Sequence, residues 1–305
     1  MSSHASAPIA STPSQAAHRP LQGIRVLSLA LNLPGPAALM RLQAMGASCT
    51  KAEPPSGDPM ARYNPTAYEA MHKGLRLLQL DLKQPADQQA LKAELALTDV
   101  LITSFRPSAL KKLGLDWPQL HATYPALIVV SIVGAAGERA EEPGHDLTYM
   151  AENDLVQGLS LPPTLYADMG GALATSEAVL QALLVRQAPG STQGQGVRME
   201  VALSDAANWL ALPRQWGLTL PDGDVGGAHA GYGVYPCLDG RVAVAALEPH
   251  FARSLCLAAG LDAAQAQAMH TAHTQAAIAG FLASQTRDEL DTLARTQDIP
   301  LHTLA

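Results

Sequence analysis

The chain has 305 residues, of which 48% are hydrophobic and 15% charged, a profile typical of a soluble globular protein and not of a disordered one. This length allows a large core and predicts two domains. The formal net charge of -7 argues against a general nucleic-acid-binding surface, although a local cluster of basic side chains could still bind a phosphate-bearing ligand.

The N-terminal residues 1–20 are rich in Ser, Ala and Pro and lack the apolar segment of a secretory signal, so we predict a flexible tail. No apolar run is long enough to span a bilayer, and no membrane contact is expected. The three cysteines, Cys49, Cys237 and Cys256, form no metal-ligand pattern. We therefore expect no metal site, a reducing compartment and a cytoplasmic location.

Strand and helix patterns alternate from residue 21 onward. The apolar residues 21–31 are typical of a buried parallel strand, and the helix predicted after the turn NLPGP ends at Gly46. Further strands are predicted at residues 47–53, 75–82, 99–105 and 126–134, with helices at 84–98, 107–115 and 117–125. Strands that alternate with helices predict an α/β fold with a Rossmann-like, doubly wound parallel sheet, in a large domain of residues 21–211.

The second half of the chain changes character. A helix or broken helix is predicted at residues 149–160, a long helix after the Pro-rich loop that starts segment 161–187, and a strand and helix within 194–212. Residues 212–240 contain seven glycines between Gly217 and Gly240, which predicts a linker. Residues 241–305 then read as a strand, the turn Glu248-Pro249 and several helices, which predicts a smaller α+β domain.

Ligands of doubly wound sheets bind beyond the carboxyl ends of the strands. The segments predicted at these ends match neither GxGxxG nor a P-loop, so the common nucleotide fingerprints are missing. Several basic residues do occur there. They are Lys51, Lys83, Arg106, Lys111 and Lys112. Each is most simply a solvated surface charge, but together they indicate a phosphate-bearing ligand.

Three acidic positions and one histidine are candidates for proton transfer. His145 and Asp146 follow a Pro-Gly turn, where Asp commonly caps a helix, so the pair taken alone is more simply structural. Asp168, just before two glycines, could likewise be a helix cap, and Glu248 could be only a turn residue before Pro249.

Eight sequence blocks favour the catalytic interpretation when they are taken together. In chain order they are LQGIRVLSLALNLPGP, MGASCTKAEPPSGD, HKGLRLLQLDLK, FRPSALKKLGL, PGHDLTY, ADMGGA, GQGVRMEVAL and GRVAVAALEPHF. This order resembles the class III CoA-transferase family, also called CaiB/BaiF, and within it the α-methylacyl-CoA racemase branch. The resemblance extends from Leu21 to the C-terminus.

The resemblance implies an acid–base pair of His145 and Asp168, assisted by Glu248. In the transferases of this family the residue matching Asp168 is a nucleophile that carries the acyl group, and the position of His145 is usually not histidine. The chain is therefore more similar to a racemase or epimerase of 2-methyl-branched acyl-CoA. A CoA-transferase that uses Asp168 as acyl carrier, and a non-catalytic CoA-binding subunit, remain the alternatives.

The chemistry of racemisation suits these side chains. Inverting a carbon beside a thioester requires one group that takes a proton and, on the other face, one that returns a proton. Neutral His145 could take the proton, and Asp168 could return one if burial raises its pKa. Glu248 would hold the tautomer of His145. A helix start at Gly144–Tyr149, capped by Asp146, could supply backbone N–H groups to the enolate oxygen.

The resemblance also implies contacts to CoA, which would enter as part of the substrate and not as a separate cofactor. The implied contact residues are Lys51, Leu80, Asp81, Leu82, Lys83, Arg106, Lys112, Gly144 and Tyr149. Three positions depart from the family pattern: Pro54 and Leu75 replace basic residues, and Ser108 replaces glycine. The resemblance also implies an interlocked dimer, which family members form through a return segment that follows the position matching Ala305. A homodimer is expected, and pairing with a homologous subunit is the alternative.

Overall fold

The structure is a computed structural model that describes residues 19–190 and 193–305, so residues 1–18 of the predicted tail lie outside it. The chain divides into two compact units, with the boundary between Leu210 and Ala211 inside helix α9 (Leu203–Gln215). Each unit has its own hydrophobic core.

The first unit is built on a six-stranded sheet in the order β3-β2-β1-β4-β5-β6, in which every neighbouring pair is parallel. Its strands are β1 (Arg25–Ser28), β2 (Ser48–Glu53), β3 (Arg76–Gln79), β4 (Val100–Thr103), β5 (Ile128–Val133) and β6 (Arg198–Ala202). The predicted doubly wound sheet is confirmed. The strand order reverses between β1 and β4, and the carboxyl ends of these two strands form the switch point where such folds bind ligands.

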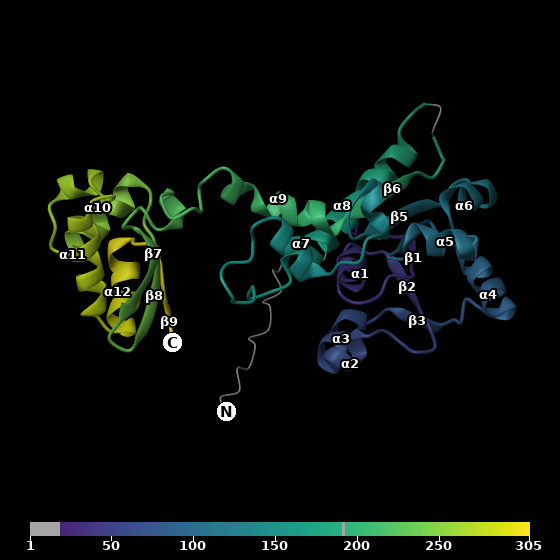
Figure 1. Cartoon of the computed structure of the whole chain (residues 1–305), viewed down its shortest axis with the longest axis horizontal. Coiled ribbons are helices and arrows are strands. Elements are labelled where there is room, and N and C mark those ends of the chain that lie inside the picture. Colours follow the sequence, from purple (N-terminus) through teal and green to yellow (C-terminus); the bar gives the residue numbers. More distant parts are fainter. Residues whose placement is uncertain (1–18, 191–192) are drawn as a thin grey trace. The chain divides into compact units, whose positions relative to one another are not determined.

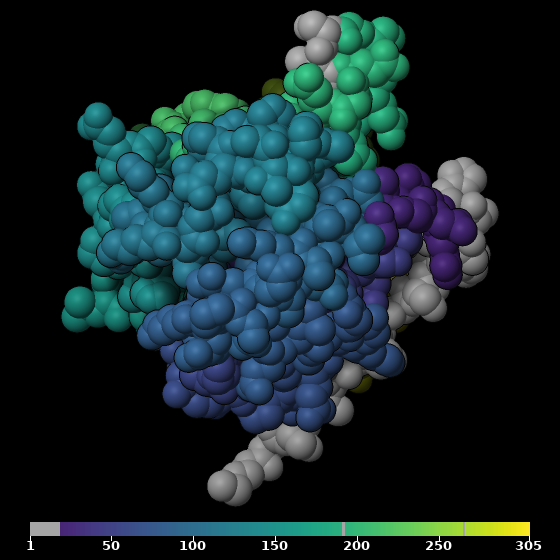
Figure 2. Space-filling view, turned by 90° about the vertical axis from the view of Figure 1, so that its right-hand side faces the viewer, coloured from purple at the N-terminus to yellow at the C-terminus, as the bar shows by residue number. Residues whose placement is uncertain are grey.

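Helices cover both faces of this sheet (Figure 1). They are α1 (Pro34–Ala44), α2 (Met60–Tyr63), α3 (Pro65–His72), α4 (Pro85–Leu95), α5 (Pro107–Leu113), α6 (Trp117–Thr123), α7 (Asp146–Glu152) and α8 (Tyr166–Gln187), with a 3₁₀ helix, η2 (Gly137–Glu141). Successive strand residues point to opposite faces. Val26 packs in the core that includes Leu39 of α1, whereas Leu27 packs in the core that includes Leu91 of α4. The side covered by α4, α5 and α6 faces the viewer in Figure 2, in blue.

The observed elements differ from the predicted ones in the first unit. Helices α2, α3 and η2 occupy segments for which the sequence predicted no helix, and α7 covers only Asp146–Glu152, whereas a helix or broken helix was predicted at residues 149–160. Gly46 follows α1 with a positive φ of 100°, as the predicted helix end requires.

The second unit packs helices against an antiparallel sheet in the order β7-β8-β9. Its elements are β7 (Tyr232–Cys237), β8 (Gly240–Ala245), α10 (Pro249–Ala258), α11 (Ala272–Ala283), α12 (Arg287–Gln297) and β9 (Leu301–Leu304), with the short 3₁₀ helices η3 (Asp224–Gly226) and η4 (Ala263–Gln267). The predicted linker 212–240 is too long, because strand β7 lies within it and Cys237 is buried in the core of the second unit.

Among the helices of residues 19–190 and 193–305, none has both the length and the apolar composition required to cross a bilayer.

Candidate functional site

A pocket opens at the carboxyl edge of the six-stranded sheet. We call it the switch-point pocket, because residues that follow β1, β4 and β5 line it together with residues of α7 and α8. Its polar and charged lining residues include Asn32, Arg106, Glu142, His145, Tyr149 and Asp168. The structure thus brings together two predicted catalytic residues, His145 and Asp168, that are 23 positions apart.

His145 stands at the start of helix α7, and its own backbone forms the cap. Its N–H donates to Thr148 Oγ1 at 3.0 Å, and the N–H of Thr148 donates to the His145 carbonyl oxygen at 2.8 Å. The prediction that Asp146 caps this helix is therefore wrong, since Asp146 is the first helical residue. These bonds hold the exposed His145 at the pocket rim.

Asp146 instead caps helix α8. The residue before α8 is Leu165, whose side chain accepts no hydrogen bond, and the buried Asp146 Oδ1 accepts the N–H of Asp168 at 2.9 Å. A carboxylate at this end of a helix also meets the positive end of the helix dipole. Asp168 is the third residue of α8 and not its N-cap, which leaves its carboxyl group to line the pocket.

The environment of Asp168 favours the protonated acid. Burial, the largest cause, and the negative charge of Asp146 both raise its pKa, His145 opposes them, and the net result is a pKa raised from 3.8 to about 6. A carboxyl group with a pKa near 6 can exchange protons close to neutral pH, which a solvated aspartate cannot do efficiently.

Tyr149 forms one wall of the pocket, and two glycines make room for its ring. A Cβ at Gly134 would come within 2.2 Å of the Tyr149 hydroxyl, and one at Gly144 within 2.5 Å. Burial raises the pKa of Tyr149, and the charge of Asp168 adds to this shift. Gly144 therefore acts here by being small. The sequence predicted that backbone N–H groups at this helix start donate to the enolate oxygen. The N–H of Tyr149 is not free for this, because it already donates to the His145 carbonyl oxygen at 3.3 Å.

A second pocket adjoins the first. We call it the β3 pocket, because it contains Leu80, Asp81, Leu82 and Lys83, the four residues that follow β3. Phe105 lines both pockets, so they are neighbours at this residue. Arg106 lies in the switch-point pocket, as predicted for a residue near the ligand, whereas Lys112 is exposed on α5 and lines neither pocket.

Lys51 does not occupy the position expected of a phosphate ligand. Its side chain has no exposed surface, and its ammonium group forms ion pairs with Asp58 and, at 2.9 Å, with Glu53. The ammonium also lies 2.8 Å from His72 Nε2. The prediction that Lys51 binds CoA is therefore not supported by its placement.

The oxygen and nitrogen atoms of Glu53, Asp58 and His72 lie close enough together to hold a metal ion. The Lys51 ammonium, however, already contacts all three residues and supplies the positive charge there. This cluster is therefore better described as a buried ionic network than as a metal site.

Glu248 lies in the second unit, where it is the exposed residue directly before α10, and its carbonyl oxygen accepts the N–H of Ala252 at 2.9 Å. Its predicted contact with His145, in the first unit, remains a prediction.

Sequence reasoning missed Asn32, Phe105, Glu142 and the Asp58–His72 part of the ionic network. Asn32 belongs to the turn NLPGP after a buried strand, and its φ of 64° is left-handed, which Asn tolerates better than most residues. The position of this turn at a strand end was the available signal.

Comparison with known proteins places the chain in a family. The model of CoA-transferase family III matches residues 21–305. The chain is 30% identical to the α-methylacyl-CoA racemase of Homo sapiens, over 79% of this chain and 65% of the human protein. It is 28% identical to the succinyl-CoA–D-citramalate CoA-transferase of Chloroflexus aurantiacus, over 94% of this chain and 79% of that protein.

Solved structures of similar proteins have the same fold. The crystal structure of Rv3272 from Mycobacterium tuberculosis superimposes with a TM-score of 0.81 at 25% identity, covering 94% of this chain and 86% of that chain. A CaiB/BaiF family protein from Brucella suis shares the fold with a TM-score of 0.77 at 24% identity, over 94% and 84% of the two chains. With the matched family model, the order of the sheet and the pocket at its switch point, these likenesses show that the chain belongs to CoA-transferase family III.

Proposed function

We propose that this protein is a racemase or epimerase that inverts the α-carbon of a 2-methyl-branched acyl-CoA. The observation that carries the proposal is the presence of His145 and Asp168 in one pocket, with the pKa of Asp168 raised to about 6. Two-base proton transfer requires one group that takes a proton and a second that can return one near neutral pH.

In one direction His145 takes the α-proton and Asp168 donates a proton to the opposite face of the planar enolate. The imidazolium and carboxylate that result return to their starting forms by proton exchange with solvent, and the opposite enantiomer uses them directly in the reverse sense. Asp146, buried against the start of α8, holds the backbone of Asp168 and disfavours its ionised form.

The CoA part of the substrate would lie along the β3 pocket, with Lys83 of that pocket and Arg106 of the switch-point pocket as the basic side chains for its phosphates. The two pockets are neighbours at Phe105, so a ligand that fills the β3 pocket can extend its thioester toward Asp168. Lys112, exposed on α5, could add charge at longer range.

A CoA-transferase is the second candidate, because relatives of this chain include transferases such as that of Chloroflexus aurantiacus. In that reaction Asp168 would attack as a carboxylate and carry the acyl group. Burial beside Asp146 disfavours the carboxylate, and His145 would have no evident task. Both features favour the racemase.

The proposal is tested by deuterium exchange. Purified protein is incubated with a 2-methylacyl-CoA in heavy water without a second acid, and loss of the α-proton signal is followed by NMR. We expect exchange by the wild type, and loss of about 10²- to 10⁴-fold in His145→Ala and in Asp168→Asn. Glu177→Gln, a change at an exposed residue of α8, is the matched control and retains activity.

Three outcomes would contradict the racemase. Normal exchange in either His145→Ala or Asp168→Asn removes that residue from the mechanism. Transfer of CoA to an added carboxylic acid, with a covalent adduct on Asp168 seen by mass spectrometry, assigns the transferase reaction instead. A chain that is inactive alone but active with a homologous partner would identify the non-catalytic subunit.

A further inference from the structure

The ionic network around Lys51 is fully satisfied. Its ammonium has three protons and three acceptors: Asp58 Oδ2, Glu53 Oε1 and His72 Nε2. The Nδ1 of His72 lies 2.6 Å from the carbonyl oxygen of Tyr68, so Nδ1 carries the hydrogen and Nε2 is free to accept. Burial lowers the pKa of His72, and the Lys51 charge adds to this, which keeps the ring neutral.

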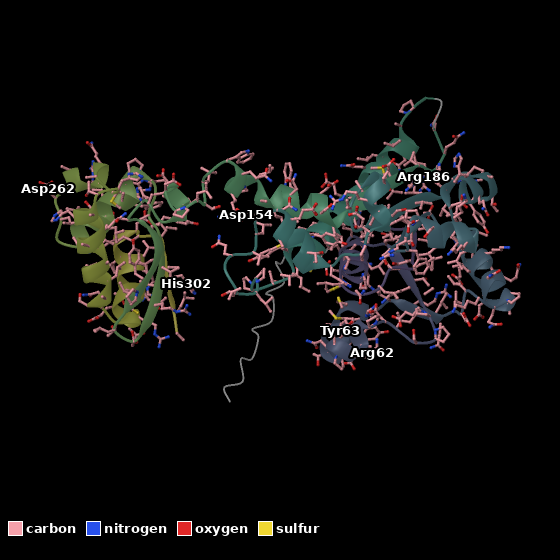
Figure 3. The ribbon with its side chains drawn as sticks, in the orientation of Figure 1. Arg62, Tyr63, Asp154, Arg186, Asp262 and His302 are labelled. Atoms are coloured by element: carbon pink, nitrogen blue, oxygen red, sulfur yellow. The ribbon has the colours of Figure 1, made fainter. Side chains whose placement is uncertain are left out.

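One arm of the network reaches the switch-point pocket. Both carboxylate oxygens of Asp58 accept the N–H of Asn32, each at 3.1 Å, and Oδ1 also accepts the N–H of Met60 at 2.8 Å. Directly after Asp58 the chain turns outward, and the side chains of Arg62 and Tyr63 on α2 lie at the surface (Figure 3). The buried Asp58 is thus the anchor of the left-handed Asn32 backbone in the pocket wall.

The other arm reaches the β3 pocket. Glu53 Oε1 contacts the Lys51 ammonium at 2.9 Å and also accepts the hydroxyl proton of Tyr68 at 3.0 Å. Glu53 and the following Pro54 line the β3 pocket. A single buried ammonium therefore holds residues in the walls of both pockets.

We propose that Lys51 is a positioning residue that sets the walls of both pockets and does not bind phosphate itself. Through Asp58 it fixes the Asn32 backbone beside the reacting groups. Through Glu53 it fixes the wall of the β3 pocket. The effect on turnover rests on the proposed racemase function, whereas the effect on the Asn32 backbone does not.

Asp58→Asn is the most direct test, because we expect the variant to fold with its remaining buried charges balanced. The wild-type network has one ammonium and two carboxylates, and the variant retains the balanced pair of Lys51 and Glu53. The new amide keeps the volume of Asp58 but offers only one acceptor atom. If its oxygen faces the Lys51 ammonium, its NH₂ group faces the N–H groups of Asn32 and Met60, and their hydrogen bonds are lost.

The first measurement is hydrogen exchange of the peptide covering residues 29–36, followed by mass spectrometry on the full-length protein. We expect Asp58→Asn to exchange the Asn32 amide at least about tenfold faster than wild type, because a buried bonded N–H becomes free. Glu94→Gln is the control. It removes a carboxylate that pairs with Arg76 on the edge strand β3, neither residue lines either pocket, and we expect this peptide and turnover to be unchanged.

The second measurement compares the effect of each variant on the turnover number with its effect on CoA affinity. We expect Asp58→Asn to lower the turnover number of α-proton exchange about tenfold, because a shifted pocket wall misplaces the substrate, and to leave CoA affinity by calorimetry within about twofold. Glu53→Gln should show the reverse pattern, in which CoA binds more weakly and the turnover number falls less than in Asp58→Asn.

A further pair of variants covers the case in which Asp58→Asn does not fold. Asn32→Ala places a penalised residue at the positive φ, whereas Asn32→Gly does not. If the backbone of Asn32 shapes the pocket, the Ala variant loses more turnover than the Gly variant.

The outcomes are distinguishable. Wild-type exchange of the 29–36 peptide in folded Asp58→Asn, or equal turnover in the Ala and Gly variants, would overturn the positioning role. A wild-type protein that exchanges no α-proton would refute the racemase, and the peptide measurement would still decide whether Lys51 and Asp58 hold Asn32.

Discussion

Two clusters in the first unit each combine two carboxyl groups with a basic side chain, but their charges are balanced differently. Around Lys51, the ammonium contacts both Asp58 and Glu53, and each of the two carboxylates has at least one further hydrogen-bond donor. Around Asp168, the second carboxyl group is Asp146, and it binds the backbone N–H of Asp168 and adds a repelling charge.

This difference separates a structural cluster from a reactive one. Buried ions that are paired and hydrogen-bonded hold the chain in place, and breaking such a pair is costly. A buried carboxyl group beside a like charge is kept near its titration point, and it can give or take a proton. The same residue types thus position the pocket wall in one cluster and, in our proposal, perform the chemistry in the other.

Removing the charge at the centre of the first cluster should have the largest effect on stability. Lys51→Met leaves Asp58 and Glu53 as buried, uncompensated carboxylates, and we expect a loss of about 3–5 kcal/mol in the free energy of unfolding. Urea unfolding monitors the change. Lys111→Met, at an exposed residue of α5, is the control and should stay within about 0.5 kcal/mol of wild type. Equal stability of the two variants would mean that Lys51 is not the anchor described here.

Removing the charge of Asp168 should instead increase the stability of the folded protein. Its folded-state pKa of about 6 lies above the unfolded value of 3.8, so the folded state binds more protons between these values. The wild type therefore loses stability as the pH rises through this window. Because Asp168→Asn cannot ionise, we expect it to be more stable than wild type by roughly 1–3 kcal/mol at neutral pH, with the difference shrinking toward pH ~4. Thermal unfolding across this range measures it, and a pH-independent difference would contradict the shifted pKa.

The smallest effect is expected from Asp146→Asn. The amide oxygen can still accept the N–H of Asp168, so the start of α8 is retained while the repelling charge is lost. The pKa of Asp168 should fall, and the limb of the pH profile of exchange that Asp168 sets should move to lower pH. An unmoved profile would show that Asp146 acts only as a cap.

Much of the fold could be predicted because its causes are local. The apolar runs that form β1, β4 and β5 are buried on both faces, and Gly46 ends α1 as its left-handed conformation predicts. The second unit was harder. The glycine-rich segment predicted a linker, but β7 within it gains its stability from pairing with β8, which no local signal reveals.

The candidate site, too, could be predicted from the sequence only in part. His145 and Asp168 could be named from their sequence blocks, and the alternation of strands and helices was enough to expect a ligand site at the carboxyl ends of the strands. Asp146 was assigned to the wrong helix because its actual partner, the N–H of Asp168, lies 22 residues away. Lys51 was expected at the surface because the residues that neutralise it, Asp58 and His72, approach it only in the folded chain.

The amino-acid sequence by itself determined the alternation of strands and helices, the family and the chemical types available for catalysis, since these depend on near neighbours and on residue identity. Only the tertiary structure decided which charged groups are neutralised by partners and which titrate close to neutral pH. The reason is physical: the energy of a buried charge depends on every polar group within a few ångströms, and those groups come from segments that only folding brings together.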